Sequence, residues 1–283
     1  MTKILTNKID FSVVLSVKNA NPNGDPLNGN RPRQDYDGFG EISDVAIKRK
    51  IRNRLQDMGE KIFVQSNDKN TDGFDSLRSR AESKEGLYKN GIKQDEFANI
   101  ACEEWIDVRS FGQVFAFKKG QGTGVSVGVR GPVSVHAAKS IEPINITSVQ
   151  ITKSVNSEPG KEKGSDTMGM KHRVDFGVYT FHGSINVQLA EKTGFTIEDA
   201  EKIKEALRTL FENDASSARP DGSMEVHKVL WWEHSSKLGQ YSSAKVHRLL
   251  NVKAQTEVPR SFEDYSIEVD DLPKLKVEMI NGQ

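Results

Sequence analysis

The chain has 283 residues, with 40 Lys and Arg against 40 Asp and Glu, so its formal net charge is zero. This balance excludes a protein that binds nucleic acid or a membrane through overall positive charge, but it leaves binding through a local basic patch open. The single cysteine, Cys102, excludes a disulfide framework and a Cys-rich zinc site.

The first elements along the chain are a strand, a loop and a helix. Residues 9–17 are apolar and β-branched, which predicts a buried strand. Residues 19–40 are rich in Asn, Pro and Gly and predict a long irregular loop, a kind of segment that is often functional. A helix follows between Ser43, in a good N-cap position, and Gly59. Its apolar residues fall on one face: Ile47, Ile51, Leu55 and Met58.

The remaining elements alternate with two polar excursions, at residues 66–96 and 156–169. Helices are expected at residues 97–105 and from Thr196 to Phe211, and an acidic tail is expected after Val258. Strands are expected at residues 114–117, 125–135, 144–155, 174–189 and 226–232. This order favours an α+β fold with helices on one face of a sheet, similar to an RNA-recognition-motif-like (ferredoxin-like) core.

Catalytic and membrane signals are incomplete or absent in the sequence. Residues 24–29 begin like a phosphate-binding loop, but Asn30 stands where a lysine is needed. Residues 120–124 lack the later glycine of a dinucleotide site, and the six histidines form no HExxH pattern. No apolar run approaches a membrane span or a secretory leader. We therefore predict a cytoplasmic protein without catalytic residues, metal or cofactor that does not contact a membrane.

The predicted helix carries a cluster of cations. Five of them lie within seven residues: Lys48, Arg49, Lys50, Arg52 and Arg54. At about 100° per residue, Arg49 lies opposite the apolar stripe and Arg52 lies beside Arg49. A row of exposed cations matches the phosphates of a nucleic-acid backbone, and a solvated helix face is the equally supported alternative.

Two further segments supply candidate contacts to nucleic acid. The loop before the helix offers amide side chains, glycine N–H groups, Arg31 and Arg33, which suit phosphate and sugar oxygens. Residues 168–173 place cations beside flexible methionines, which could wedge between the bases of single-stranded RNA. When each segment is considered alone, a plain surface loop remains the alternative for the first, and a surface hairpin remains the alternative for the second.

Five short motifs occur together in one order. They are NPNGDP at 21–26, ISDVAIKRKIRN at 42–53, DVRSFG at 107–112, VRGPVSV at 129–135 and MGMKHRVDFGVY at 168–179. In this order they resemble the major backbone subunit of a type I CRISPR surveillance complex (Cascade), specifically that of type I-C. The resemblance extends from about residue 9 to residue 250.

The resemblance implies a hand-shaped α+β protein whose RNA-recognition-motif-like palm carries finger and thumb insertions. The palm would comprise residues 1–65, 97–155 and 174–257, the finger 66–96 and the thumb-like hairpin 156–173, with an acidic tail at 258–283. Met168 or Met170 would be the wedge that displaces a guide base. The expected RNA-binding residues are Asn21, Asn23, Gly24, Arg31, Arg33, Lys48, Arg49, Arg52, Asn53, Met168, Met170, Lys171, His172 and Arg173.

The resemblance also implies the partners. Copies would stack head to tail along the CRISPR RNA and present it for pairing with target DNA, beside other Cascade subunits. A recruited nuclease-helicase, not this chain, would cut the DNA. One alternative is a metal-dependent RNA endonuclease subunit that uses Asp35, Asp37 or Asp107. Another is a stand-alone RNA-binding protein that does not polymerise.

Overall fold

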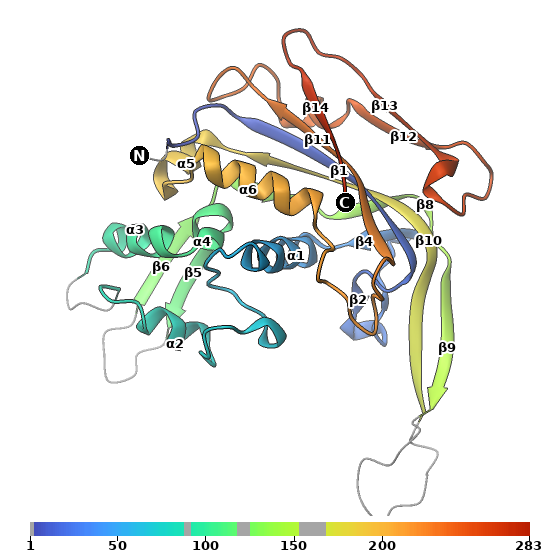
Figure 1. Ribbon diagram of the computed structural model, residues 1–283, viewed down its shortest axis with the longest axis horizontal. Coiled ribbons are helices and arrows are strands. Elements are labelled where there is room, and N and C mark those ends of the chain that lie inside the picture. The colour runs from blue at the N-terminus through green and yellow to red at the C-terminus, as the bar shows by residue number, and fades with distance from the viewer. Residues whose placement is uncertain (1–2, 88–91, 118–124, 153–167) are drawn as a thin grey trace, which may run out of the picture.

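A large antiparallel sheet forms the centre of the computed structural model, which describes residues 3–87, 92–117, 125–152 and 168–283 (Figure 1). Within these residues the sheet has eight strands, in the order β14-β11-β1-β10-β8-β4, with β7 and β9 also paired to β10. The strands are β1 Ile9–Ala20, β4 Phe39–Ile42, β7 Val133–Val135, β8 Ala138–Pro143, β9 Ile146–Thr152, β10 Met168–Ile185, β11 Met224–Glu233 and β14 Val277–Asn281. The α+β class is confirmed.

Strand β1 lies in the middle of the sheet, as its apolar sequence predicts. It pairs with β10 on one side and β11 on the other. Phe11, Val13 and Leu15 belong to the core on one face of the sheet, whereas Val14 belongs to the core on the opposite face. Because both faces of the sheet are covered, every residue of β1 from Ile9 to Val17 is buried, including the polar residues Asp10, Ser12 and Ser16.

Three helices cover the first face of the sheet: α1 Asp44–Asp57, α5 Val187–Thr193 and α6 Ile197–Arg208. The Ser43 hydroxyl accepts a hydrogen bond from the Ala46 N–H at 3.3 Å, and Thr196 forms a capping box with Asp199. The predicted apolar stripe of α1 is buried against the sheet. Helices α1 and α6 are therefore confirmed, whereas α5 occupies residues that were expected to extend a strand.

The order of these elements along the chain is β1, α1, β7 and β8, β10, α6 and β11. In the sheet the corresponding strands lie in the order β11, β1, β10, and then β7 and β8. Helix α6 thus connects the central strand β10 to β11 on the far side of β1, whereas α1 follows the edge strand β4 and lies between β1 and β7–β8 along the chain.

The C-terminal part of the chain covers the second face. It contains α7 Ser243–His247 and the hairpin of β12 Leu250–Ala254 with β13 Tyr265–Val269. Val246 and Leu275 pack there against Val14 and Trp232. Residues 258–283, expected to form an acidic tail, contain the strands β13 and β14, and β14 extends the main sheet.

A second lobe lies beside α1 and α5 (Figure 1). It contains α2 Leu77–Glu82, α3 Gln94–Glu104, α4 Ile106–Phe111, β5 Gly112–Phe117 and β6 Val125–Arg130. Its own core joins Phe63, Ala81 and Leu87 to Phe97 and Phe115. Residues on both sides of the boundary expected at Glu96 therefore share one core, to which the polar segment contributes Leu87, with Leu77 and Ile92 packed against it.

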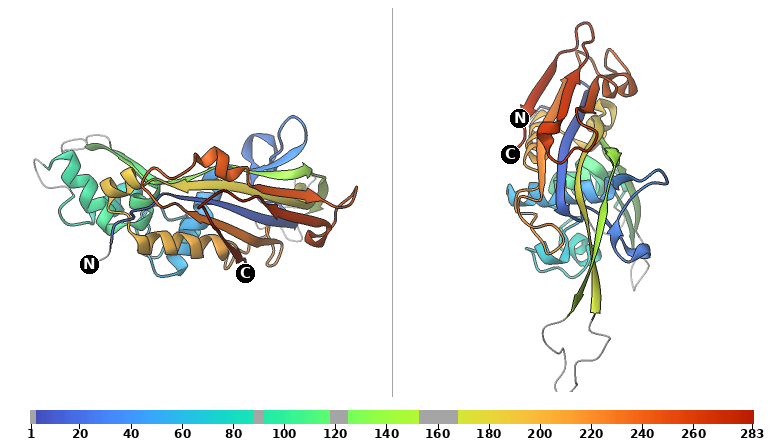
Figure 2. Two further views of the ribbon diagram at one scale, coloured as in Figure 1. Left: turned by 90° about the horizontal axis from the view of Figure 1, so that it is seen from above. Right: turned by 90° about the vertical axis from the view of Figure 1, so that its right-hand side faces the viewer.

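Two segments near the main sheet differ from the expected loops. Residues 19–40 contain a short hairpin, β2 Gly24–Asp25 with β3 Arg31–Pro32, and the start of β4. Strands β9 and β10 continue beyond the sheet as a two-stranded ribbon (Figures 1 and 2). Residues 153–167, most of the expected thumb, lie outside the described residues. None of the described helices has the length and apolar character needed to cross a bilayer.

Candidate nucleic-acid interface

A cavity of about 320 Å³ lies beside helix α1, and we call it the α1 cleft. Its walls come from four segments: the turn after β1, helix α1, residues 66–69 and residues 213–219. Four of the residues predicted from sequence line it together. They are Asn23, Gly24, Arg49 and Asn53.

The turn after β1 is held against the start of α1 by its amide side chains. The Asn23 Oδ1 accepts a hydrogen bond from the Ser43 N–H at 2.9 Å. Asn21 is buried, and its Nδ2 donates to the Asn30 carbonyl at 2.7 Å. A Cβ at Gly24 would lie 2.0 Å from the Asn30 Oδ1, so this position admits only glycine. Asn21 therefore shapes the turn, while Asn23 and Gly24 reach the cleft.

Helix α1 contributes a cation and an amide to the cleft. The Arg49 Nη1 donates to the Val64 carbonyl at 2.5 Å. Within the described residues no carboxylate lies at ion-pair distance from Arg49, and burial together with Arg52 lowers the pKa of its guanidinium. The Asn53 Oδ1 is buried, and no described residue forms a hydrogen bond to it. Arg49 and Asn53 thus line the cleft from consecutive turns of one helix.

The opposite wall contains an ionic cluster. The Asp214 carboxylate bonds to the Lys50 Nζ and also to the Arg219 Nε, at 3.2 Å. Burial lowers the pKa of Lys50 to about 8, against the attraction of Asp214. Cations outnumber acids in the lining, which contains Arg49, Lys50, Lys69 and Arg219 against Asp68 and Asp214. Lys69 also pairs with Asp57 at 2.9 Å from outside the lining, so one positive charge remains in excess. This excess of positive charge suits a phosphate group.

Helix α1 does not present the expected row of free cations, because three of its cations are paired with acids. Lys48 pairs with Asp44 at 3.1 Å, Arg52 with Asp107 at 3.0 Å and Arg54 with Glu212 at 2.7 Å. Two of these acids come from distant parts of the chain, so the helix sequence could not reveal them. Lys48 and Arg52, both predicted to bind RNA, do not line the α1 cleft.

Arg31 and Arg33 lie outside the cleft, in the β2–β3 region. The Arg31 Nη1 donates to the Ser148 Oγ at 2.9 Å, and Ser148 in turn bonds to the His172 Nδ1 at 2.8 Å. The Arg33 Nη2 lies 3.6 Å from the Asp25 Oδ1. Arg31 therefore connects the hairpin to the base of the β9–β10 ribbon.

The ribbon divides the predicted segment 168–173 between its two faces. The register pairs Met168, Met170 and His172 with Thr152, Gln150 and Ser148, whereas Lys171 and Arg173 pair with Val149 and Thr147. Because side chains alternate along a strand, the two methionines and His172 share one face, and Lys171 and Arg173 occupy the other. Met168 and Met170 are each 55% exposed.

Several cleft residues were missed by sequence reasoning, above all Lys69, Asp214 and Arg219. They come from segments without apolar periodicity, about 12 and 160 residues after the end of α1 along the chain. The local signal at Arg219 is a single arginine before Pro220. Such a pair is too common in sequences to indicate a binding site. The fold, not a motif, brings these residues to α1.

Two of the three aspartates of the nuclease alternative, Asp107 and Asp35, have structural partners, whereas Asp37 is exposed. Asp107 is 1% exposed and accepts from the Phe63 and Val64 N–H groups as well as from Arg52. Asp35 accepts from the Phe39 N–H, and the ion pair with Lys139 lowers the pKa of its carboxyl. Within the described ranges, no group of three or more His, Cys, Asp or Glu side chains could hold a metal.

Comparison with known proteins gives consistent matches. A family model described as CRISPR-associated protein Cas7 matches residues 7–270. A relative from Haloferax volcanii, named CRISPR-associated protein Cas7, is 26% identical over 289 residues and covers 94% of this chain and 82% of its own length.

Solved structures show weaker likeness. A chain of a CRISPR RNA-guided surveillance complex in a pre-nicking state has 14% identity and a TM-score of 0.48, over 80% of this chain and 78% of its own. A chain of another CRISPR RNA-guided surveillance complex has 16% identity and a TM-score of 0.43, over 80% and 68%.

Proposed function

The chain belongs to the CRISPR-associated Cas7 family, and from this premise we propose that it is the RNA-binding backbone subunit of a CRISPR RNA-guided surveillance complex, specifically a type I-C Cascade. Copies stack head to tail along the CRISPR RNA and present it to target DNA. Other Cascade subunits bind beside the stacked copies, and a recruited nuclease-helicase cuts the DNA. A head-to-tail contact that does not close on itself generates a helical filament, which suits this role.

The α1 cleft is the observation that carries the RNA-binding proposal. A guide holder must accept any guide sequence, so it should grip the sugar–phosphate backbone and leave sequence reading to base pairing. Among the described residues, Arg49 has no carboxylate at ion-pair distance and the Asn53 Oδ1 has no hydrogen-bond partner, and the cleft lining has an excess of cations. These groups fit phosphate and sugar hydroxyl groups, and they include no set of groups dedicated to one base.

The connectivity of the main sheet supports an RNA-recognition-motif-like palm. In a ferredoxin-like core, two β-α-β units interlock so that the last strand and the second strand flank the two central strands. The order β11, β1, β10 and β7–β8, with α1 and α6 on one face, follows this pattern. The second lobe corresponds to the finger in this proposal.

The β9–β10 ribbon supports a thumb. It projects from the palm and presents Met168, Met170 and His172 on one face, near Arg31. Flexible apolar side chains can wedge between bases and unstack them. Displacement of one guide base by Met168 or Met170 is therefore part of the proposal.

We further propose that the chain does not cleave RNA. A catalytic aspartate must reach the scissile phosphate or a bound metal, whereas the Asp107 carboxylate is engaged by three donors inside the protein. Asp35 is bound in its own turn and to Lys139. These contacts favour structural roles for both residues over the nuclease alternative.

Removal of one charge from the cleft tests the binding site. We expect Arg49→Gln to weaken RNA binding and to reduce the slope of log affinity against log salt by about 1, because one phosphate contact is lost. Arg208→Gln is the matched control, since Arg208 pairs with Glu205 outside the cleft. Fluorescence anisotropy at several salt concentrations measures both effects. Equal slopes for the two variants would remove the α1 cleft from the interface.

A further inference from the structure

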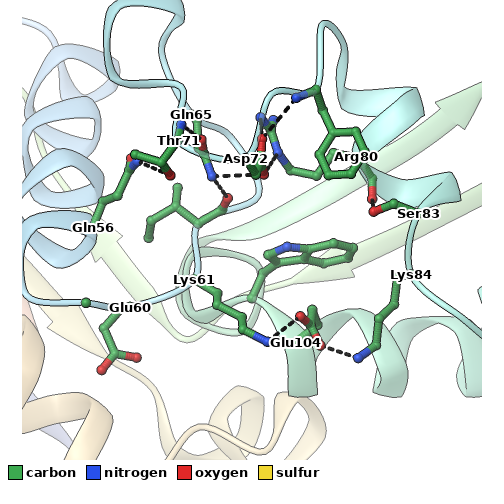
Figure 3. Close-up of a pocket in the computed structure, with 14 residues that line it drawn as sticks. Gln56, Glu60, Lys61, Gln65, Thr71, Asp72, Arg80, Ser83, Lys84 and Glu104 are labelled. Atoms are coloured by element: carbon green, nitrogen blue, oxygen red, sulfur yellow. Dashed lines mark hydrogen bonds and ion pairs between the residues drawn. The ribbon is translucent and has the colours of Figure 1, made fainter.

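A second cavity, of about 470 Å³, lies in the second lobe next to the end of α1 (Figure 3), and we call it the lobe pocket. Its size falls in the range of about 300–1,000 Å³ that is typical of small-ligand sites. The lining comes from the end of α1, residues 60–65, residues 71–74, α2 and its C-terminal end, and the end of α3. None of the RNA-binding residues predicted from the sequence lines this cavity.

Every charge in the lining is balanced by another residue. Glu104 bonds to Lys61 at 2.8 Å and to Lys84, which approach it from two sides (Figure 3). Across the pocket, Asp72 accepts two hydrogen bonds from Arg80, at 2.6 and 2.8 Å. Glu60 pairs with Lys202 at 2.8 Å. The pocket therefore has no surplus charge for a phosphate and suits a neutral ligand, in contrast to the α1 cleft.

The lining also offers one unused hydrogen-bond acceptor and two aromatic side chains. The Gln56 Nε2 donates to the Lys69 carbonyl at 2.7 Å and to the Thr71 Oγ1 at 3.1 Å, which fixes the orientation of the amide. Within the part of the chain that the structure describes, the Gln56 Oε1 is then buried without a hydrogen-bond partner. Phe74 and Trp105 contribute apolar ring surface. A neutral planar group with N–H donors, such as a nucleobase, matches this combination.

The lobe pocket and the α1 cleft lie on two sides of the same structural elements. Asn53 lines the cleft and Gln56 lines the pocket, and three residues of α-helix rise by about 4.5 Å. Lys69 lines the cleft and Thr71 the pocket, within one loop that Gln56 holds through its amide. The two cavities are therefore neighbours that share helix α1 and the loop after it.

From these observations we propose that the lobe pocket binds one unpaired nucleobase of the RNA whose backbone lies in the α1 cleft. The inference rests on the proposed function, and it assigns the second lobe a direct role in holding RNA. The rival occupant is a neutral side chain from a neighbouring copy, which predicts a loss of assembly and not a loss of RNA affinity.

A substitution that fills the mouth of the pocket tests the proposal. Ser83 is exposed at the end of α2 and lines the pocket, so Ser83→Trp obstructs it with little effect on the core. The matched control is Ser235→Trp, at an exposed serine outside the lining. The probes are a short single-stranded RNA and an abasic oligonucleotide with the same backbone and length, measured by anisotropy.

Wild-type protein should bind the RNA more tightly than the abasic oligonucleotide. We expect Ser83→Trp to weaken RNA binding about 5- to 100-fold, the range for loss of one bound base, and to change abasic binding much less. If Ser83→Trp binds the short RNA like wild type, the proposal is overturned, whether or not assembly on long RNA is lost. If wild type binds neither oligonucleotide, the proposed function itself fails, which is a separate result.

Tryptophan fluorescence gives a second readout that does not depend on obstruction. Trp105 is one of three tryptophans and lines the pocket. A base in the pocket should change its emission, so addition of RNA should alter the fluorescence of wild type more than that of Trp105→Phe. Phenylalanine retains the ring packing against Phe63. Equal changes in both proteins would contradict the proposal.

Discussion

The carboxylate of Asp107 joins three parts of the chain, and its removal is the most informative test of how the RNA-binding helix is held. Its Oδ1 accepts from the Phe63 N–H at 2.7 Å, and its Oδ2 accepts from the Val64 N–H at 3.1 Å and from the Arg52 Nε at 3.0 Å. Asp107 is 1% exposed, and the Arg52 side chain is 13% exposed. The carboxylate therefore anchors α1 to α4 and to the start of the second lobe.

The structure sets the size of the effect of Asp107→Ala. Breaking a buried ion pair by removing one partner costs about 3–5 kcal/mol, because the other charge stays buried. Each buried N–H group left without an acceptor costs about 1–3 kcal/mol. These penalties overlap, since water or small shifts relieve part of each, so we expect a loss of about 4 kcal/mol in the free energy of unfolding.

Urea unfolding of three variants separates these contributions. Asp107→Ala should lose the most stability, and Arg52→Met should lose less, because Asp107 keeps its two backbone donors. The double variant should be more stable than the sum of the two losses predicts, because no unpaired cation remains buried.

The same variants test the nuclease alternative. If Asp107→Ala unfolds within about 0.5 kcal/mol of wild type, as an ordinary surface substitution does, the anchoring role is refuted. A wild-type protein that cleaves RNA in the presence of Mg²⁺, with activity abolished in that stable variant, would establish the nuclease.

Two further predictions concern the main sheet. Burial, with His247 and His136, lowers the pKa of His182 to about 4. The folded state therefore favours the neutral His182 ring. The contribution of this ring to the free energy of unfolding is fully present above pH ~6.5 and should be lost as the pH falls toward 4. The expected loss in the free energy of unfolding is about 3 kcal/mol. The urea midpoint of His182→Gln should therefore change less with pH than that of wild type. Gly183→Ala should lower the free energy of unfolding by about 1–3 kcal/mol, because its Cβ would lie 2.2 Å from the Phe11 Cζ. The control is Gly128→Ala, whose Cβ would meet no atom within 4 Å, so this variant should have the same melting temperature as wild type.

The elements that the sequence predicted well are those whose own residues determine them. The β-branched run of β1 and the 3.6-residue periodicity of α1 and α6 are local signals, and their caps at Ser43 and Thr196 are local as well. Helix α5 was missed because it is short and directly continues the apolar sequence of β10. Strand β14 was missed because the acidic composition of the C-terminal segment indicated a tail. Its pairing with β11, which is distant in sequence, gives no local signal.

The candidate site was only partly predictable, for a similar physical reason. Composition identified a basic helix, but only the fold reveals that Asp107 and Glu212 neutralise two of its cations. Likewise, only the fold reveals that Arg219 lines the cleft, because its loop is more than 160 residues away from α1 along the chain. In the ribbon, the strand register separates Lys171 from Met170 although the two residues are adjacent.

The mass of the complex formed with RNA tests the central claim most directly. Native mass spectrometry of the purified protein with single-stranded RNAs of two lengths counts the bound copies. A backbone subunit should bind each RNA with several copies, and the number should rise in proportion to RNA length. One copy per RNA at both lengths, or no binding to either RNA, would contradict the account.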